Sequence, residues 1–192
     1  MKDFAPPQPE DLRRLLSGFD TLLTDTAGVL QAAVLILICA SDENIFIPLT
    51  LRSKDLPVHA GQVCLPGGRV SSTDSCLEMT AVREAREEIG VKLELSNVLG
   101  CLPATRTNSG FEVTPVVAWI YESPVFQLEP NEVSELIALP LELVLDLSQY
   151  KQDSIIENGV ERTFCYMEFG GFRIWGATAR ILHSLAHLVR TQ

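Results

Sequence analysis

Three glutamates placed close together are the residues of this sequence best suited to chemistry. Glu84, Glu87 and Glu88 lie within five positions of residues 67–91, GGRVSSTDSCLEMTAVREAREEIGV, a stretch that otherwise has the composition of a helix. Positions i, i+3 and i+4 share one helical face. Carboxylate oxygens at that spacing can converge on a hard divalent cation such as Mg²⁺ and on its water ligands. A solvated helix face is the alternative, and spacing alone does not decide between the two.

Local energetics disfavour this cluster unless a cation is present. Glu84 and Glu88 set like charges one turn apart, and Arg83 precedes Glu87 by four residues, which is the weaker orientation for an ion pair. Each of these effects is worth about 0.2–0.5 kcal/mol. Glu88 also lies in the last turn, where the helix dipole disfavours an anion. A bound divalent cation reverses the sign of these contributions.

The other positions of the helix predict how it packs. With Glu84 set at zero, the apolar residues spread from about 60° to about 220° around the axis. We therefore expect the three glutamates, Glu84, Glu87 and Glu88, to form an acidic wedge that borders the buried face. Arg86 and Glu78 fall inside the apolar arc, so one of them must extend past its edge. The apolar set consists of Met79, Ala81, Val82, Ala85 and Ile89.

Two adjacent glycines precede the helix. The short apolar run QVCLP ends at Gly67 and Gly68, and glycines there permit positive φ and a close approach of the backbone to a ligand. We expect a tight turn at this pair, between a strand and the helix. A glycine pair alone is also typical of an ordinary turn. The combination of strand, glycine pair, acidic residue and R-E-A-R-E-E-I-G-V is far more specific.

This combination resembles the box of the Nudix hydrolase family, G-x5-E-x7-R-E-U-x-E-E-x-G-U, in which U is aliphatic. The first half departs from it, because Asp74 stands in place of Glu six residues after Gly68, and eight residues instead of seven follow it. This one-residue expansion with Asp resembles the coenzyme A pyrophosphatase branch of the family. The second half is matched in full by Arg83, Glu84, Ala85, Glu87, Glu88, Gly90 and Val91.

The upstream stretch LTLRSKDLPVHAGQVCLPGG is similar to the additional signature of that branch, in which T-x-R-S precedes a basic residue, G-Q and F-P-G-G. Pro57 stands in place of the basic residue and Leu65 in place of the Phe. The resemblance is strongest between residues 50 and 91. The matching positions are Thr50, Arg52, Ser53, Gly61, Gln62, Pro66, Gly67 and Gly68.

The resemblance implies hydrolysis of a phosphoanhydride by water, with Mg²⁺ (or Mn²⁺) as the cofactor. It implies that Glu87 and Glu88 are direct metal ligands and that Glu84 is a ligand or a proton acceptor. Arg83 is expected to brace these carboxylates rather than to contact the substrate. The alternative for Arg83 is an ordinary surface ion pair.

The same resemblance implies a substrate-binding segment. Arg52, at the end of a strand, either clamps a phosphate or is a solvated cation. Gln62 either holds a substrate hydroxyl or amide or caps the turn. The family often takes a further acid from a later loop, and PNEVSEL offers Glu132, which we prefer, or Glu135; solvated surface is the alternative for either. The segment comprises Arg52, Gly61, Gln62, Gly67 and Gly68.

Three functions are compatible with these motifs. The leading hypothesis is hydrolysis of coenzyme A or its thioesters to 3′,5′-ADP and 4′-phosphopantetheine or its acyl form. The second keeps the chemistry with another small-molecule substrate, such as ADP-ribose, a nucleotide sugar, a dinucleotide or a nucleoside triphosphate, and Pro57 is its best support. The third is a non-catalytic nucleotide sensor, against which stands the complete carboxylate set in R-E-A-R-E-E.

Composition limits the partners. The 192 residues include 15 Lys and Arg against 25 Asp and Glu, a formal net charge of -10 without a basic patch, so no nucleic-acid partner is expected. The same field opposes a phosphate substrate, which therefore requires local arginines, backbone N–H groups or bound cations. A homodimer remains open.

No membrane association is expected either. The apolar run at 27–40 has 14 residues, whereas a bilayer span takes about 20. The N-terminus lacks the basic start and apolar centre of a secretory signal, and the five cysteines lack CxxC spacing, so a cytoplasmic location is expected. His183 and His187, four residues apart, could form another metal site, but without neighbouring carboxylates a surface or packing role is the better hypothesis.

Hydrophobic patterns predict one domain, 1–192, of the α/β class. Paired strands are expected in AAVLILICA, buried on both faces, and NIFIPLTLR, with further strands in VLGCLPATR and FEVTPVVAWIY. RTFCYMEFGGFRIWG is expected to form a hairpin turning at Gly170 and Gly171, with Trp175 in the core rather than stacked on a base. Helices are expected in PEDLRRLLSGF, as a peripheral element, LPLELVLDL and TARILHSLAHLVR. Such alternation is typical of a mixed sheet covered by helices, and the resemblance implies a Nudix-like α/β/α sandwich.

Overall fold

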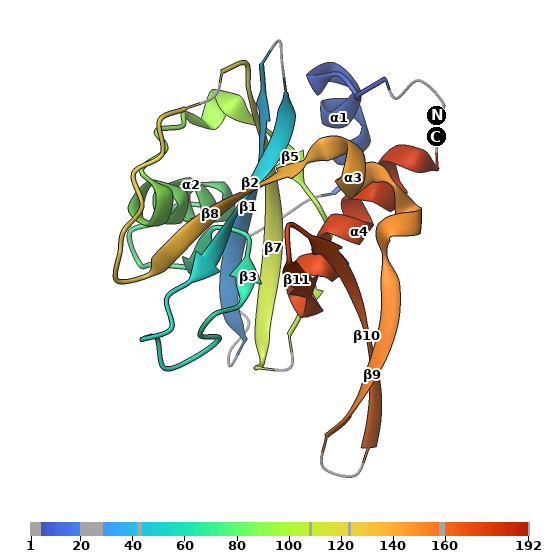
Figure 1. Ribbon diagram of the computed structural model, residues 1–192. Coiled ribbons are helices and arrows are strands. Elements are labelled where there is room, and N and C mark those ends of the chain that lie inside the picture. The colour runs from blue at the N-terminus through green and yellow to red at the C-terminus, as the bar shows by residue number, and fades with distance from the viewer. Residues whose placement is uncertain are drawn as a thin grey trace.

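The computed structural model has a mixed central sheet with helices against both faces (Figure 1). The predicted α/β class with a central mixed sheet is therefore confirmed. The structure describes residues 5–19, 29–41, 44–107, 109–122, 124–157 and 160–191.

Strand β1 (Leu30–Ala40) lies at the centre of this sheet, and most of its residues are buried, as its unbroken apolar run predicts. It pairs in parallel with β7 (Phe111–Ile120) and antiparallel with β2 (Ile45–Arg52). The remaining strands are β3 (Val63–Cys64), β4 (Gly67–Arg69), β5 (Val98–Cys101), β6 (Thr105–Arg106) and β8 (Val133–Pro140). The main order is β3-β2-β1-β7-β5, and β4 pairs with β1, β6 with β7 and β8 with β2.

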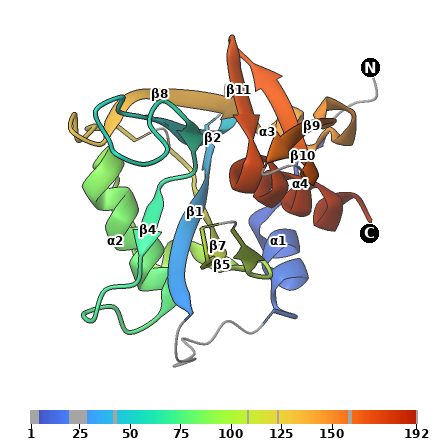
Figure 2. The same cartoon turned by 90° about the horizontal axis from the view of Figure 1, so that it is seen from below.

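Helices cover the two faces of the sheet unequally. Helix α2 (Leu77–Ile89) covers one face, whereas α1 (Pro9–Leu16), α3 (Leu141–Leu145) and α4 (Gly176–Arg190) cover the other (Figures 1 and 2). Two short 3₁₀ turns lie at Leu95–Asn97 and Leu147–Gln149. In the described part of the chain, none of the helices has the length and apolar content to span a membrane.

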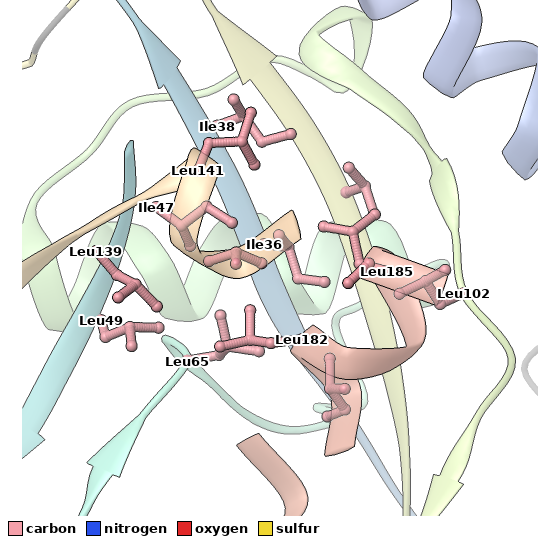
Figure 3. Close-up of a cluster of buried hydrophobic side chains, with 14 of the residues drawn as sticks. Ile36, Ile38, Ile47, Leu49, Leu65, Leu102, Leu139, Leu141, Leu182 and Leu185 are labelled. Atoms are coloured by element: carbon pink, nitrogen blue, oxygen red, sulfur yellow. The ribbon is translucent and has the colours of Figure 1, made fainter. Parts of the chain in front are cut away.

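Two hydrophobic cores lie on opposite sides of β1. Because side chains alternate along a strand, Ile36 and Ile38 point toward α3 and α4, whereas Leu35 and Leu37 pack under α2. Figure 3 shows the first of these cores, in which side chains of β1, β2 and β8 gather with those of α3 and α4. Because α2 covers the second, smaller core, this core and its edge position the carboxylates of the helix.

A separate antiparallel sheet packs against α4. Its strands are β9 (Lys151–Glu157), β10 (Val160–Phe169) and β11 (Phe172–Trp175). The predicted hairpin turn at Gly170 and Gly171 is confirmed. Met167 and Ile174 of its inner face are buried, whereas Trp175 on the outer face is 40% exposed, so its expected place in the core is wrong. The β9 and β10 strands extend away from the rest of the molecule (Figure 1).

Two strands have no clear signal in the sequence. The loop expected at PNEVSEL is limited to the turn at residues 130–132, which includes Glu132, because β8 begins at Val133 and pairs with β2. The β2–β8 register shifts between Leu51 and Arg52, so the burial of β8 does not alternate cleanly. Strand β9, KQDSIIE, is largely polar and exposed, and only its pairing with β10 makes it a strand.

Helix α1 is present as predicted but is not peripheral. Leu12 and Leu16 are each only 1% exposed and belong to the core between the sheet and α4. The apolar stripe of this short helix is narrow, which is why a peripheral position was expected. The helix nevertheless contacts β5, and its leucines fill the end of the core. The helix therefore contributes to stability through packing rather than through its own propensity.

We expect Leu12→Ala to lower the free energy of unfolding by about 2–5 kcal/mol, the range for truncating a fully buried leucine. Urea denaturation at constant pH measures this change. Arg14→Ala is the matched control on the same helix, because the ion pair of Arg14 with Asp11 is solvent-exposed and such pairs contribute about 0–1 kcal/mol. Equal stability of the two variants would mean that α1 is peripheral after all.

Candidate active site

Helix α2 presents to the sheet a face different from the one that its apolar residues predict. Glu88 lies inside the buried face and is 3% exposed, whereas Met79 and Arg86 are exposed. The expectation that the whole acidic wedge borders this face is therefore wrong for Glu88. The reason is a hydrogen bond from the backbone of β4, which holds the Glu88 carboxylate against that strand. The buried residues of the helix are Leu77, Thr80, Ala81, Ala85, Glu88 and Ile89.

Gly67 and Gly68 lie in strand β4 and not in the tight turn expected from the sequence. Gly67 pairs with Val34, and Gly68 with Ala33, in an antiparallel ladder with β1. A Cβ atom added to Gly67 would lie 2.4 Å from the carbonyl oxygen of Ala33 and 2.6 Å from the Cα of Val34. Glycine is therefore needed at this position for β4 to approach β1.

Gly68 makes room for a carboxylate. A Cβ atom added to Gly68 would lie 2.4 Å from the carboxyl carbon of Glu84. The absence of a side chain thus lets the Glu84 carboxylate lie directly against the backbone of β4. Burial of this carboxylate raises the pKa of Glu84, and the charges of Glu87 and Glu132 act in the same direction.

Glu88 is held by two groups from other elements. Its Oε2 accepts a hydrogen bond from the backbone N–H of Gly67 at 3.2 Å, and its Oε1 lies 3.9 Å from Nη1 of Arg52. Burial nevertheless raises the pKa of Glu88 to about 7, with further contributions from the charges of Glu84 and Glu132. The two stabilising contacts only partly offset the removal of this carboxylate from water.

Arg83 connects the acidic side chains of this region. Its Nη1 donates to Oε1 of Glu84 at 2.7 Å and to Oε2 of Glu87 at 3.0 Å. Its Nε and Nη2 donate to the two carboxylate oxygens of Asp74 at 3.0 and 2.9 Å, and Nη2 also donates to the carbonyl oxygen of Arg69. The guanidinium is thus fully engaged by protein groups, which is the geometry of a positioning residue.

Asp74, the residue that replaces the usual glutamate of the box, anchors this guanidinium. The hydrogen bonds from Arg83 hold the pKa of Asp74 at about 2, with help from Ser71 and Thr80. Thr80 was not expected at the site. Its only signal in the sequence is a polar residue on the face of α2 that faces the sheet.

Of the substrate-binding segment expected from the sequence, Gly61 and Gln62 lie in the loop between β2 and β3, Arg52 ends β2, and Gly67 and Gly68 lie in β4. The N–H of Arg52 donates to the carbonyl of Gln62 at 3.0 Å, and the N–H of Gly61 donates to the carbonyl of Arg52. The Gln62 side chain contacts Nδ1 of His59 at 2.9 Å. The Nε atom of Arg52 is buried and has no hydrogen-bond partner among the described residues. Arg52 therefore reaches Glu88 with a donor still to be satisfied.

Glu132 and Glu135 differ in their relation to the carboxylates. Glu132 immediately precedes β8, its carbonyl accepts the N–H of Ser53 at 2.8 Å, and its charge raises the pKa of both Glu84 and Glu88. Glu135 lies within β8 and is exposed. The structure thus brings Glu132 toward the acidic residues of α2.

The carboxylates of Glu84, Glu87 and Glu88 are ligands that suit a hard divalent cation, although they do not yet surround a common point. In the part of the chain that the structure describes, no three His, Cys, Asp or Glu side chains already surround a common point as metal ligands. Glu87 is 58% exposed and is held by Arg83. Burial and, to a smaller extent, repulsion between carboxylates raise the pKa of Glu84 and Glu88. A bound cation offsets both effects, and carboxylates are the ligands that Mg²⁺ prefers.

The two C-terminal histidines have a packing geometry. The rings of His183 and His187 stack with their centroids 6.3 Å apart, and His183 packs edge-on against Tyr150 at 4.9 Å. Neither ring lies near a carboxylate cluster among the described residues. A packing role therefore accounts for this pair.

A family model described as NUDIX domain matches residues 29–158, which is more than half of the chain. The chain belongs to the Nudix hydrolase family. Nudix hydrolases act on pyrophosphate bonds of nucleoside diphosphate derivatives and generally use divalent metal ions. The Nudix box of this chain therefore runs from β4 through Asp74 to the end of α2, over the contacts described above.

Similar proteins agree with this assignment. Relatives from several bacteria are named Uncharacterized Nudix hydrolase NudL. The relative from Pectobacterium atrosepticum is 42% identical over 158 residues, which cover 81% of each chain. The one from Salmonella newport is 36% identical over 179 residues, which cover 91% of this chain and 93% of its own. A crystal structure of a MutT/nudix family protein from Enterococcus faecalis has a TM-score of 0.59 and 17% identity, and covers 97% of this chain and 76% of that one. This last likeness shows the Nudix fold alone.

Proposed function

We propose that this Nudix hydrolase cleaves the phosphoanhydride bond of coenzyme A or acyl-CoA, giving 3′,5′-ADP and 4′-phosphopantetheine or its acyl form. The observation that carries the proposal is the contact between Arg52 and Glu88. It joins the β2–β3 segment, which resembles the coenzyme A pyrophosphatase signature, to the carboxylates of the Nudix box. A substrate held by that segment would thus lie against the acidic residues of α2.

Each site residue has a defined role in this proposal. Glu84, Glu87 and Glu88 would hold the divalent ion, Mg²⁺ or Mn²⁺. Gly68 admits Glu84 to the β4 backbone, and the N–H of Gly67 holds Glu88. When bound, such an ion neutralises phosphate charge and makes water a better nucleophile.

Water supplies the oxygen that forms the new bond to phosphorus, and the bond to the bridging oxygen breaks. The carboxylate of Glu84 or of Glu132 takes the proton of the water. Both are candidates because the charge of Glu132 acts on Glu84, so the two carboxylates belong to the same acidic region. The leaving phosphate departs with the bridging oxygen. Arg83 keeps Glu84 and Glu87 in place, and Arg52 offers its unsatisfied donor to a phosphate.

Another nucleoside diphosphate derivative is the second candidate, and Pro57 favours it. This residue is exposed in the β2–β3 loop, where the signature has a base. Two other residues of the loop, Lys54 and His59, are exposed and can carry positive charge. Lys54 is therefore an additional candidate for the contact with the 3′-phosphate of coenzyme A.

We expect higher kcat/KM for coenzyme A or short acyl-CoA than for ADP-ribose and NADH, with no more than about a tenfold loss for 3′-dephospho-CoA. A full charge-assisted contact to the 3′-phosphate is worth about 1.5–3 kcal/mol, which corresponds to more than tenfold. Steady-state assays with Mg²⁺ and chromatographic separation of products measure these ratios.

A loss well above tenfold would show that another residue recognises the 3′-phosphate, and Lys54→Ala then tests whether Lys54 supplies the charge. A better rate with ADP-ribose or a nucleoside triphosphate would contradict the coenzyme A assignment and leave only the Nudix chemistry. Tight nucleotide binding without turnover of any of these compounds would favour the non-catalytic sensor instead.

A further inference from the structure

The outer face of the β9–β11 sheet carries a group of aromatic side chains, of which Trp175 is exposed and Phe164 and Tyr166 are half-buried. Because side chains alternate along strands, Phe164 and Tyr166 of β10 share this face with Arg173 and Trp175 of β11. The Phe164 and Trp175 rings pack edge-on with centroids 5.6 Å apart, and Phe164 lies 6.4 Å from Tyr166. We call these four residues the aromatic face.

The aromatic face is ordered by a cation. The guanidinium carbon of Arg173 lies 3.9 Å from the centroid of the Tyr166 ring and 5.4 Å from that of Phe164. Arg173 is ion-paired with Asp153 of β9. A planar guanidinium and an indole ring are thus presented together, both of them partly open to solvent. Such an arrangement is suited to stacking with another planar, polarisable ring.

Two cationic residues of this face, Arg173 and Lys151, are already paired with carboxylates. Arg173 pairs with Asp153, and Lys151 pairs with Glu168 at 3.0 Å. A phosphate would find no free positive charge in these two pairs, whereas a neutral planar base needs none. The chemistry therefore favours a nucleobase over an anionic group.

Strand β11, which ends at Trp175, contacts β3, the strand that follows the β2–β3 loop. Thr178, three residues after Trp175, donates its hydroxyl to the carbonyl of Val63 at 3.3 Å. Val63 follows Gln62, whose carbonyl is bonded to the N–H of Arg52. Figure 1 shows β11 beside β3, with the β2–β3 loop and the β9–β10 hairpin extending from the same end of the molecule. The strand that carries Trp175 is thus connected, through β3 and Gln62, to the residue proposed to hold a phosphate, Arg52.

We infer that the aromatic face, with Trp175 as its main contact, stacks the nucleobase of the substrate. This assignment rests on the proposed function only in that the substrate is a nucleotide, and it does not depend on coenzyme A. It makes Trp175 a residue for substrate affinity rather than for the chemical step. The base is bound by its flat face, so adenine is not distinguished from other bases by stacking alone.

Binding of a matched pair of non-hydrolysable probes tests this inference. Adenosine 5′-(α,β-methylene)diphosphate carries a base, and methylenediphosphonate carries the same bridged phosphates without one. The chain has two tryptophans, and the other, Trp119, is buried. We expect the nucleoside probe to quench the fluorescence of the wild-type protein and not that of Trp175→Phe, and methylenediphosphonate to quench neither.

Calorimetry with the same probes measures the contribution of stacking. Trp175→Ala should weaken binding of the nucleoside probe about 5- to 150-fold, the range found when a stacking aromatic is replaced by alanine. Binding of methylenediphosphonate should be unchanged, and Trp175→Phe should retain most of the nucleoside affinity. Tyr121→Ala is the control, because it removes an aromatic ring that is 73% exposed at the end of β7.

Three results would overturn the inference: equal nucleoside affinity in wild type and Trp175→Ala, quenching that persists in Trp175→Phe, and failure of the nucleoside probe to bind. Loss of affinity for both probes in Trp175→Ala would also contradict it, since that pattern indicates a general structural defect. If the probe binds through Trp175 but coenzyme A is not cleaved, the result supports the stacking site and contradicts the proposed substrate.

Discussion

Glu88→Gln is expected to lower kcat/KM by more than about 100-fold while the protein remains folded. The change removes a charged oxygen from the site proposed to hold the metal, and loss of a direct ligand should exceed the 10- to 100-fold effect of losing an outer-shell partner. The amide has the shape of the carboxylate, and its oxygen can still accept the N–H of Gly67. Steady-state kinetics with saturating Mg²⁺ and thermal melting of the same samples measure the two effects.

The raised pKa of Glu88 gives the direction of the stability change. Its pKa rises from 4.5 to about 7 on folding, so the wild-type protein should lose stability as pH increases through that interval. Glu88→Gln has no proton to lose there. Without metal at pH 8, its melting temperature should therefore be no lower than that of the wild type.

Other carboxylates of α2 separate the metal hypothesis from a general effect of charge. Glu87→Gln and Glu84→Gln should also be severely impaired, whereas Glu78→Gln should keep nearly full activity because Glu78 contacts Cys101 at the other end of the helix. Mg²⁺-dependent rates that are unchanged in Glu87→Gln and Glu88→Gln would rule out the assignment of these residues as metal ligands.

Gly68→Ala is expected to reduce activity about 100-fold or more with little loss of stability. The added methyl group would meet the Glu84 carboxylate at 2.4 Å, and that carboxylate is the far end of a flexible side chain, which can move aside. Its displacement removes Glu84 from the β4 backbone and from the proposed metal site. Enzyme assays and urea denaturation of the same preparation measure the two effects separately.

Gly67→Ala should behave in the opposite way to Gly68→Ala, because its methyl group would strike the backbone of β1 at Ala33 and Val34. A backbone cannot move aside without breaking the β1–β4 pairing, so the loss of stability should reach or exceed the 1–3 kcal/mol typical of overpacking. Gly18→Ala, where the added atom has open space, is the control for both variants. A stable Gly67→Ala, or a fully active Gly68→Ala, would contradict the role of β4 described above.

Elements with a strong local pattern were predictable from the sequence. The apolar runs of β1 and β2, the period of α2 and α4 and the glycine turn between β10 and β11 all depend on neighbouring residues. The pattern of carboxylates in R-E-A-R-E-E likewise points to the chemistry, because residues three and four apart on a helix must share a face. The resemblance to the Nudix family starts from this same stretch, and the family model that matches residues 29–158 confirms it.

The tertiary structure alone decided how that helix is turned. Hydrophobicity places Met79 in the buried face and Glu88 at its border, whereas the structure exposes Met79 and buries Glu88. The difference arises because a strand of two glycines and an arginine pairs with β1 and offers a backbone N–H to a carboxylate 21 residues further along the chain. No local pattern records a contact at that separation.

The same reason explains the other differences. Strands β8 and β9 exist because β2 and β10 satisfy their backbone hydrogen bonds, and α1 is buried because β5 and α4 leave a space for Leu12 and Leu16. Trp175 is exposed because Ile174, its neighbour, takes the core side of β11. The sequence by itself determined which residues could do chemistry. Long-range strand pairing decided which of these residues are buried, and burial in turn sets the pKa of their side chains and the groups that they contact.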